Sequence, residues 1–204
     1  MIKAGSYAIQ AKADDNLMSH FILRNSGMLT VNGGTFGDTD TDRTNDNTLN
    51  WGAALINLEN GTAVLNGGYF TCGDNYWAGK PNGSANYSYA VRSYGELTIN
   101  YATVYGKMNG GVAADDGETI INDGDFSVSG SKSYYVAVTN SGTSSTITIN
   151  GGTFTKTGGY GDILGGFSGM PSWDASEDLE DNGYYVTGGT FIKDGKTVEF
   201  TAQQ

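Results

Sequence analysis

The stretch NGGTF occurs at residues 32–36 and again at 150–154, and its variant NGGYF lies between them at 66–70. It ends a longer phrase of the form G-x-L-T-I-N-G-G-T-F, in which apolar and polar residues alternate before the Asn. Alternation with a period of two predicts a β-strand with one buried face, and two consecutive Gly residues predict a tight turn after it. We therefore expect each copy to form a corner of a repeated β unit.

Copies of this phrase recur along nearly the whole chain at unequal intervals. The Asn position and its equivalents are Lys3, Asn32, Asn66, Asn100, Asn122, Asn150 and Thr187. The shortest interval, the 22 residues from Asn100 to Asn122, matches about one turn of a β-solenoid with three short strands. Unequal copies disfavour a propeller or a helical repeat, whose units hold their period closely. The extra length of the other copies predicts inserted loops.

A second strand is expected upstream of each phrase, because each upstream segment ends in a turn of Asn, Asp or Ser with Gly. These segments span 20–27, 53–61, 89–95, 111–117 and 135–142. After the Gly pair comes a column that should stack in the core, formed by Tyr7, Phe36, Phe70, Val104, Phe126, Phe154 and Phe191. The Asn column should turn inward at the corner, where its side chains would hydrogen-bond the next copy.

With these features the chain resembles the right-handed parallel β-helices of the pectin-lyase-like superfamily, and more narrowly the LTINGGTF-type repeat regions of gut-bacterial surface proteins. The shared phrase covers nearly all of residues 2–191. The resemblance implies an all-β fold, a single-stranded right-handed parallel β-helix (solenoid) of about six to seven coils. We expect one domain over 1–204, with a C-terminal hairpin cap at 191–200 around Asp194-Gly195. The lack of a capping segment before Ile2 favours a fragment of a longer repeat protein, and a native start that packs against a partner is the alternative.

Composition argues against several classes of partner. The chain has 11 Lys plus Arg against 22 Asp plus Glu, a net charge of −11, so the phosphate backbone of a nucleic acid would be repelled. The sequence contains no run of 18 apolar residues that would predict membrane insertion, and no signal-peptide core. The resemblance implies a secreted or cell-surface protein whose signal lies outside this chain. The single Cys, Cys72, excludes an intramolecular disulfide.

Three insertions follow the aromatic column, at 37–51, 71–88 and 155–182, and loops on a rigid scaffold commonly carry binding residues. They contain an aromatic set that we interpret as candidate platforms for sugar rings: Trp51, Tyr76, Trp77, Tyr87, Tyr160 and Trp173. The alternative is that the Trp residues fold back and fix the loops to the side of the scaffold.

The first insertion contains Asp38, Asp40 and Asp42 at alternate positions, and Ca²⁺ prefers such oxygen ligands. The stretch is not an EF-hand, because Arg43 stands where the loop needs Gly and Leu49 where it needs Glu. A solvated acidic loop is the alternative. Ca²⁺ is therefore a candidate ligand, and no cofactor is required.

Arg24 and Arg92 occupy the same repeat position, three residues before the turn Gly, with Leu58 between them in the intervening copy. Two Arg residues on one sheet could grip the carboxylate of an acidic sugar, as a polysaccharide lyase would need. Structural pairing with nearby acidic residues is the alternative. The position continues as Ala114 and Thr139, which add neither a base nor a metal ligand.

Other catalytic candidates lack partners. His20 has no Ser or Cys at motif spacing, and Cys72 has no evident base. Asp115 and Asp116 are the best pair of carboxylates for glycoside hydrolysis, although adjacent Asp residues before a Gly are also ordinary turn formers.

Three functions fit these features. The first is a non-catalytic extracellular module of a bacterial surface adhesin-like protein, whose loops bind a glycan or another surface ligand. The second is a polysaccharide lyase or glycoside hydrolase of the pectin-lyase-like superfamily. The third is a phage tail or fibre segment or a structural spacer, in which the uncapped first coil would allow end-to-end self-association.

Overall fold

The computed structural model describes residues 6–7, 20–37, 52–71, 89–107, 110–129, 137–142, 144–158, 162–165 and 179–200. Within these ranges the chain is an all-β protein built from two sheets whose strands are parallel, apart from one C-terminal hairpin. The one helical segment in these ranges is a short 3₁₀ turn, η1 (Glu180–Asn182). The expected all-β class is therefore confirmed.

The smaller sheet contains the strands predicted upstream of each repeat phrase. Its order follows the chain, with every neighbouring pair parallel: β2 (His20–Asn25), β4 (Gly52–Asn57), β6 (Tyr89–Ser93), β9 (Gly110–Ala114), β12 (Val138–Asn140) and β15 (Leu164–Gly165). The last of these, β15, lies inside the segment 155–182 that the sequence assigned to a loop. The repeat has therefore one more member in this sheet than the sequence predicts.

The larger sheet contains the repeat phrase itself. In its first two complete copies one bent strand runs through the Gly pair, as β3 (Met28–Phe36) and β5 (Thr62–Thr71). Later copies are split there into two strands: β7 (Glu96–Ile99) and β8 (Thr103–Lys107), β10 (Glu118–Ile121) and β11 (Asp125–Ser129), β13 (Thr146–Ile149) and β14 (Thr153–Thr157), β16 (Tyr184–Val186) and β17 (Thr190–Lys193). The cryptic first copy contributes β1 (Ser6–Tyr7), which pairs with β3 in the predicted register.

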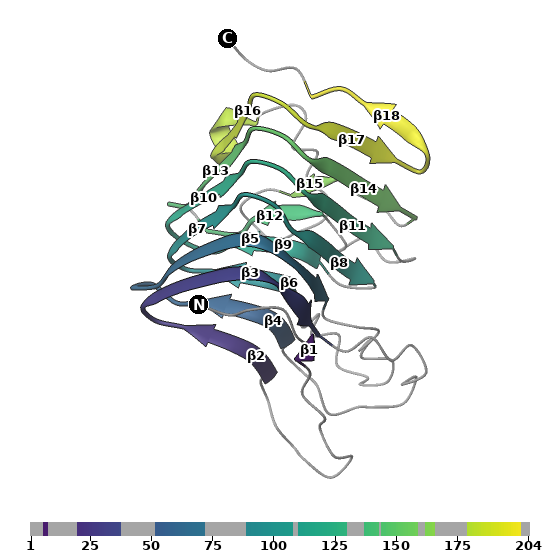
Figure 1. Cartoon of the computed structure of the whole chain (residues 1–204). Coiled ribbons are helices and arrows are strands. Elements are labelled where there is room, and N and C mark those ends of the chain that lie inside the picture. Colours follow the sequence, from purple (N-terminus) through teal and green to yellow (C-terminus); the bar gives the residue numbers. More distant parts are fainter. Residues whose placement is uncertain are drawn as a thin grey trace, which may run out of the picture.

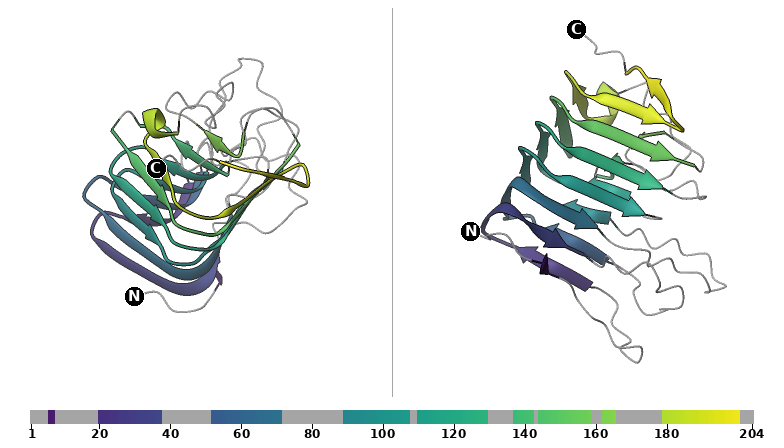
Figure 2. Two further views of the ribbon diagram at one scale, coloured as in Figure 1. Left: turned by 90° about the horizontal axis from the view of Figure 1, so that it is seen from above. Right: turned by 45° about the vertical axis from the view of Figure 1, so that its right-hand side comes forward.

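We call one strand of the smaller sheet and the phrase that follows it a rung. Successive rungs stack in sequence order from the purple to the yellow end of the molecule (Figure 1), and the view from above shows one rung lying over the next (Figure 2). Residues at equivalent repeat positions are therefore register partners in adjacent strands, as in the pairs Leu97–Thr119 and Thr119–Ile147.

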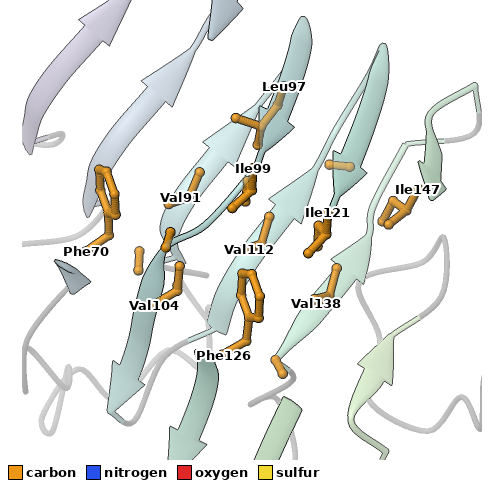
Figure 3. Close-up of a cluster of buried hydrophobic side chains, with 14 of the residues drawn as sticks. Phe70, Val91, Leu97, Ile99, Val104, Val112, Ile121, Phe126, Val138 and Ile147 are labelled. Atoms are coloured by element: carbon orange, nitrogen blue, oxygen red, sulfur yellow. The ribbon is translucent and has the colours of Figure 1, made fainter. Parts of the chain in front are cut away.

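The core lies between the two sheets. Every second side chain of the strands before the Asn corner points inward and meets apolar side chains of the smaller sheet (Figure 3). Ile99, Ile121 and Ile149 of the larger sheet are fully buried, as are Val91, Val112 and Val138 of the smaller one. The alternation seen in the sequence thus corresponds to one buried and one outward face of the larger sheet.

The predicted aromatic column forms a stacked ladder. Ring centroids are 4.9 Å apart between Phe36 and Phe70, 4.8 Å between Phe126 and Phe154, and 4.9 Å between Phe154 and Phe191. Val104 interrupts the ladder between Phe70 and Phe126, with which it is in register. Phe200 packs edge-on against Phe191, at 4.5 Å between centroids. Apart from the rung of Val104, each of these rungs adds a Phe ring to the buried column, and each stacked ring stabilises its neighbour.

The Asn column forms a ladder, but its predicted inward direction is wrong. Each Asn Nδ2 donates to the Oδ1 of the previous Asn, at 2.9 Å from Asn66 to Asn32 and 2.8 Å from Asn100 to Asn66, and the series runs on through Asn122 and Asn150 to Thr187. All six residues are exposed. The larger sheet bends at this corner, and the Asn side chains lie on the outer, convex side of the bend. The ladder therefore lies on the surface.

The two Gly residues of the phrase are needed for different reasons. The second takes a positive φ, as in Gly152 at 101°. The first lies against the preceding rung, where a Cβ on Gly151 would come 2.6 Å from the carbonyl oxygen of Asn122. One position is thus set by backbone conformation and the other by the distance between rungs.

The predicted C-terminal hairpin is present. β18 (Lys196–Val198) pairs antiparallel with β17, and the two-residue turn at Asp194 and Gly195 has φ values of 50° and 75°. Two positive φ values are typical of the turn that suits the twist of a β-hairpin. In the described part of the larger sheet, β18 is the outermost strand beside β17.

Candidate functional site

Most of the sequence-predicted ligand residues lie outside the described ranges. These are the aromatic residues Trp51, Tyr76, Trp77, Tyr87, Tyr160 and Trp173, the candidate Ca²⁺ ligands Asp38, Asp40 and Asp42, and the lone Cys72. They stay predictions. Of the remaining candidates, Arg24 and Arg92 lie on β2 and β6, and His20 begins β2.

The structure brings Arg24 and Arg92 to one position of the smaller sheet, but the residue predicted between them is wrong. Ile56 pairs with both Arg24 and Arg92, in place of Leu58, and the series continues through Ala113 rather than Ala114 to Thr139. Counting back three residues from the turn Gly gives Leu58 in place of Ile56, because the turn after β4 is two residues longer than the turns after β2 and β6.

Arg92 forms a structural ion pair with a residue of the next rung. Its Nε and Nη2 donate to the two carboxylate oxygens of Asp115, each at 2.7 Å, and Ser141 Oγ donates to the same carboxylate at 2.9 Å. Burial lowers the pKa of Arg92, but the hydrogen bond and the charge of Asp115 outweigh it and raise the pKa. The alternative of pairing with an acidic residue is thus confirmed for Arg92, while Arg24 is exposed.

The two adjacent carboxylates of the turn after β9 have separate structural partners. Asp115 holds Arg92, and Asp116 accepts hydrogen bonds from Ser144 Oγ at 2.8 Å and from the backbone N–H of Gly117 at 2.9 Å. The Ser144 hydrogen bond, and then that of Gly117, lower the pKa of Asp116. Both side chains therefore support turns of neighbouring rungs, in agreement with the turn-forming interpretation.

A buried polar column that the sequence did not reveal holds the turns between the two sheets. Asn25 Nδ2 donates to Asn57 Oδ1 at 2.8 Å, and Asn57 Nδ2 donates to Ser93 Oγ at 3.1 Å. Asn57 also donates to the backbone oxygens of Gly61 at 3.1 Å and Glu96 at 2.9 Å. These inward-facing side chains are different residues from the Asn column of the repeat phrase, for which the sequence predicted the inward direction.

An open pocket of about 370 Å³ lies at the tips of these turns. Three consecutive rungs line it with Ser26, Leu58, Glu59, Asn60 and Tyr94. The sequence signal was the longer turn after β4, which departs from the repeat. Pockets of this kind, with an aromatic and an aliphatic side chain beside a few polar groups, can hold a small ligand. We call this the turn-tip pocket.

The Tyr94 ring of the turn-tip pocket is in contact with Arg92. The guanidinium carbon lies 5.2 Å from the ring centroid, a cation–π geometry. Burial is the largest cause of the raised pKa of the Tyr94 hydroxyl. The side chain is therefore neutral at pH 7. Arg92, in turn, is held by its ion pair with Asp115.

A second pocket, of about 390 Å³, lies at the C-terminal end between the last Gly pair and β18, with walls from residues 186–191 and 197–200. Within the described ranges, no group of three or more His, Cys, Asp or Glu side chains is arranged to hold a metal ion. None of the helical segments there is long and apolar enough to cross a membrane.

Comparison with protein-family models, with curated proteins and with solved structures found no match to this chain.

Proposed function

We propose that this chain is a non-catalytic, glycan-recognising module of a bacterial surface adhesin-like protein, built as a right-handed parallel β-helix. The stacked aromatic ladder is the observation that carries the scaffold half of this proposal. Rings spaced by 4.8–4.9 Å, and parallel strands that follow one another in chain order, are what a coil of this kind requires. The repeat phrase then serves the scaffold, and recognition belongs to residues that the repeat does not need.

The engagement of the candidate catalytic groups supports the non-catalytic half. An acidic sugar bound by Arg92 would have to compete with the carboxylate of Asp115, to which Arg92 donates two hydrogen bonds. A general acid at Asp116 would need a raised pKa, whereas the hydrogen bonds from Ser144 and Gly117 lower it. A lyase or hydrolase role is therefore less well supported than binding.

The test is direct. The chain is incubated with pectate, alginate and neutral polysaccharides, with and without Ca²⁺, and the products are analysed by mass spectrometry beside a glycan array. We expect binding on the array and no shortened or unsaturated oligosaccharides. Release of unsaturated products would contradict the non-catalytic assignment, and an array without any signal would contradict glycan recognition.

A further inference from the structure

We propose that the turn-tip pocket binds one neutral pyranose ring, stacked on Tyr94. The choice of a sugar as ligand rests on the proposed glycan-recognising function, but none of the residues that line the pocket belongs to the three sequence-predicted loops. Those loops follow the aromatic column, whereas the turn-tip pocket lies at the turns from the smaller to the larger sheet.

The shape and composition of the pocket fit a single sugar ring. Its volume of about 370 Å³ is near the lower end of the range for ligand pockets, roughly 300–1,000 Å³. Tyr94 and Leu58 offer apolar surface to the C–H face of a ring. Glu59, Asn60 and Ser26 offer a carboxylate, a carboxamide and a hydroxyl to the sugar hydroxyls, and within the described ranges these three side chains form no other hydrogen bond.

The residues around the pocket are held in place by an ion pair and by backbone hydrogen bonds. Arg92 reaches Asp115 of the following rung, while Ser26 and Leu58 come from the two preceding rungs, so the guanidinium and the pocket lie toward opposite neighbours of β6. The longer turn is fixed by the hydrogen bonds from Leu58 N to Asn25 O at 2.9 Å and from Gly61 N to Leu58 O at 2.7 Å. A site that is ordered in advance loses less entropy on binding.

Charge selects a neutral sugar over an acidic one. Glu59 is an exposed carboxylate, the nearby Arg92 is neutralised by Asp115, and the chain carries a net charge of −11. A uronic acid would meet repulsion without an available cation. Neutral hexopyranoses meet no such barrier.

The experiment is saturation-transfer difference NMR on the full chain, with methyl β-glucoside, methyl β-galactoside, methyl α-mannoside and methyl β-glucuronide as probes. We expect saturation of the C–H protons of at least one neutral glycoside and a weaker signal for the glucuronide. Tyr94→Ala should weaken the affinity about tenfold, while Tyr94→Phe, which keeps the ring, should stay within about threefold. Tyr185→Ala, at a tyrosine that is 49% exposed and outside the pocket, is the matched control and should change nothing.

Three outcomes would overturn the proposal: no saturation of any neutral glycoside, a stronger signal for the glucuronide, or unchanged affinity in Tyr94→Ala. Circular dichroism checks that each variant is folded. If Tyr94→Ala is not, Asn60→Ala at the exposed turn tip takes its place, and we expect it to weaken binding severalfold. Glu59→Gln should raise the glucuronide signal.

The triple variant with Trp51, Trp77 and Trp173 replaced by Ala separates the two sites. We expect it to keep glycoside binding at the turn-tip pocket. If it loses this binding while Tyr94→Ala does not, the pocket assignment is wrong and glycan recognition belongs to the loops. The proposed function would survive that result.

Discussion

Asn57 and Asn66 belong to the same rung and carry the same side chain, yet their surroundings differ. Asn57 is fully buried and donates to Ser93 and to two backbone oxygens, whereas Asn66 is exposed in the outer ladder. A buried polar group that loses its partner costs about 1–3 kcal/mol, while water replaces a lost partner at the surface. The two positions therefore separate the structural roles of Asn in this repeat.

We expect Asn57→Ala to lower the free energy of unfolding by about 3 kcal/mol or more, because it leaves several buried groups without partners. Asn66→Ala, the matched control, should cost less than about 1 kcal/mol. Urea unfolding followed by circular dichroism measures both. Equal costs at the two positions would contradict the assignment of one ladder to the interior and the other to the surface.

Thr119 shows the opposite situation, a buried hydroxyl without a partner. Its Oγ1 forms no hydrogen bond within the described part of the chain, and the residue lies in register with the apolar Leu97 and Ile147. Thr119→Val should raise the free energy of unfolding by about 1 kcal/mol, since it removes an unsatisfied polar group at nearly constant shape. Thr148→Val on the outward face of β13 is the control, with an expected change near zero, and a destabilised Thr119→Val would refute the prediction.

At the scale of elements, the aromatic ladder joins each rung to the next. Phe70 is fully buried, stacks on Phe36 and lies in register with Val104. Phe70→Ala should cost roughly 3–5 kcal/mol, because it removes the ring and leaves a cavity. Val64→Ala, on the outward face of the same strand, should cost much less. Thermal and urea unfolding measure both, and tolerance of Phe70→Ala would contradict the observed register.

Tyr184 ties the last strands of the two sheets together. Its hydroxyl donates to the backbone oxygens of Gly165 at 2.6 Å and Val138 at 3.2 Å, across the core. Burial, the largest cause, raises the pKa of this hydroxyl well above its usual value of about 10. Above pH 10 the unfolded chain therefore ionises this group and the folded chain does not, so stability falls as the pH rises.

We expect Tyr184 to contribute a loss of stability that grows with pH and approaches about 1.4 kcal/mol per pH unit well above pH 10. The free energy of unfolding is measured from pH 9 to pH 11 for the wild-type chain and for Tyr184→Phe. The variant keeps the other tyrosines, so the difference between the two slopes belongs to Tyr184. Parallel slopes would show that this hydroxyl is not protected in the folded state.

At the scale of the molecule, stacked rungs make stability depend on neighbours. Strands in the middle, such as β7 and β10, have a hydrogen-bonded neighbour on both sides, whereas β16 has a described neighbour on one side only. In stacked repeats each unit is stabilised mainly by the units beside it. The ends should therefore open more readily than the middle.

Hydrogen–deuterium exchange read by mass spectrometry tests this gradient. We expect amides of 96–99 and 118–121 to exchange most slowly, and those of 184–186 and 196–198 to exchange at least about tenfold faster. Uniform exchange across all rungs would mean that the chain opens only as a whole, against this expectation.

The strands, the aromatic ladder and the C-terminal turn could be determined from the sequence alone. The evidence for them was the alternating phrase, the turn residues and the two-residue hairpin. These features depend on neighbours along the chain: a period of two, a positive φ at Gly, and rings that recur at one repeat position. Stacking of the copies in register then follows, because residues at the same repeat position lie beside one another in adjacent strands.

Only the tertiary structure decided where the polar ladders face and which residues meet across rungs. The outward Asn column, β15 inside a predicted loop, Ile56 between the two Arg residues, and the Arg92–Asp115 pair all depend on turn lengths and on the bend of the sheet. The bend of the sheet, and the contacts that each turn makes with the next rung, are set by packing between rungs, which local sequence does not encode. The turn-tip pocket has the same origin, because a turn two residues longer than its neighbours becomes a binding surface only when three rungs are stacked around it.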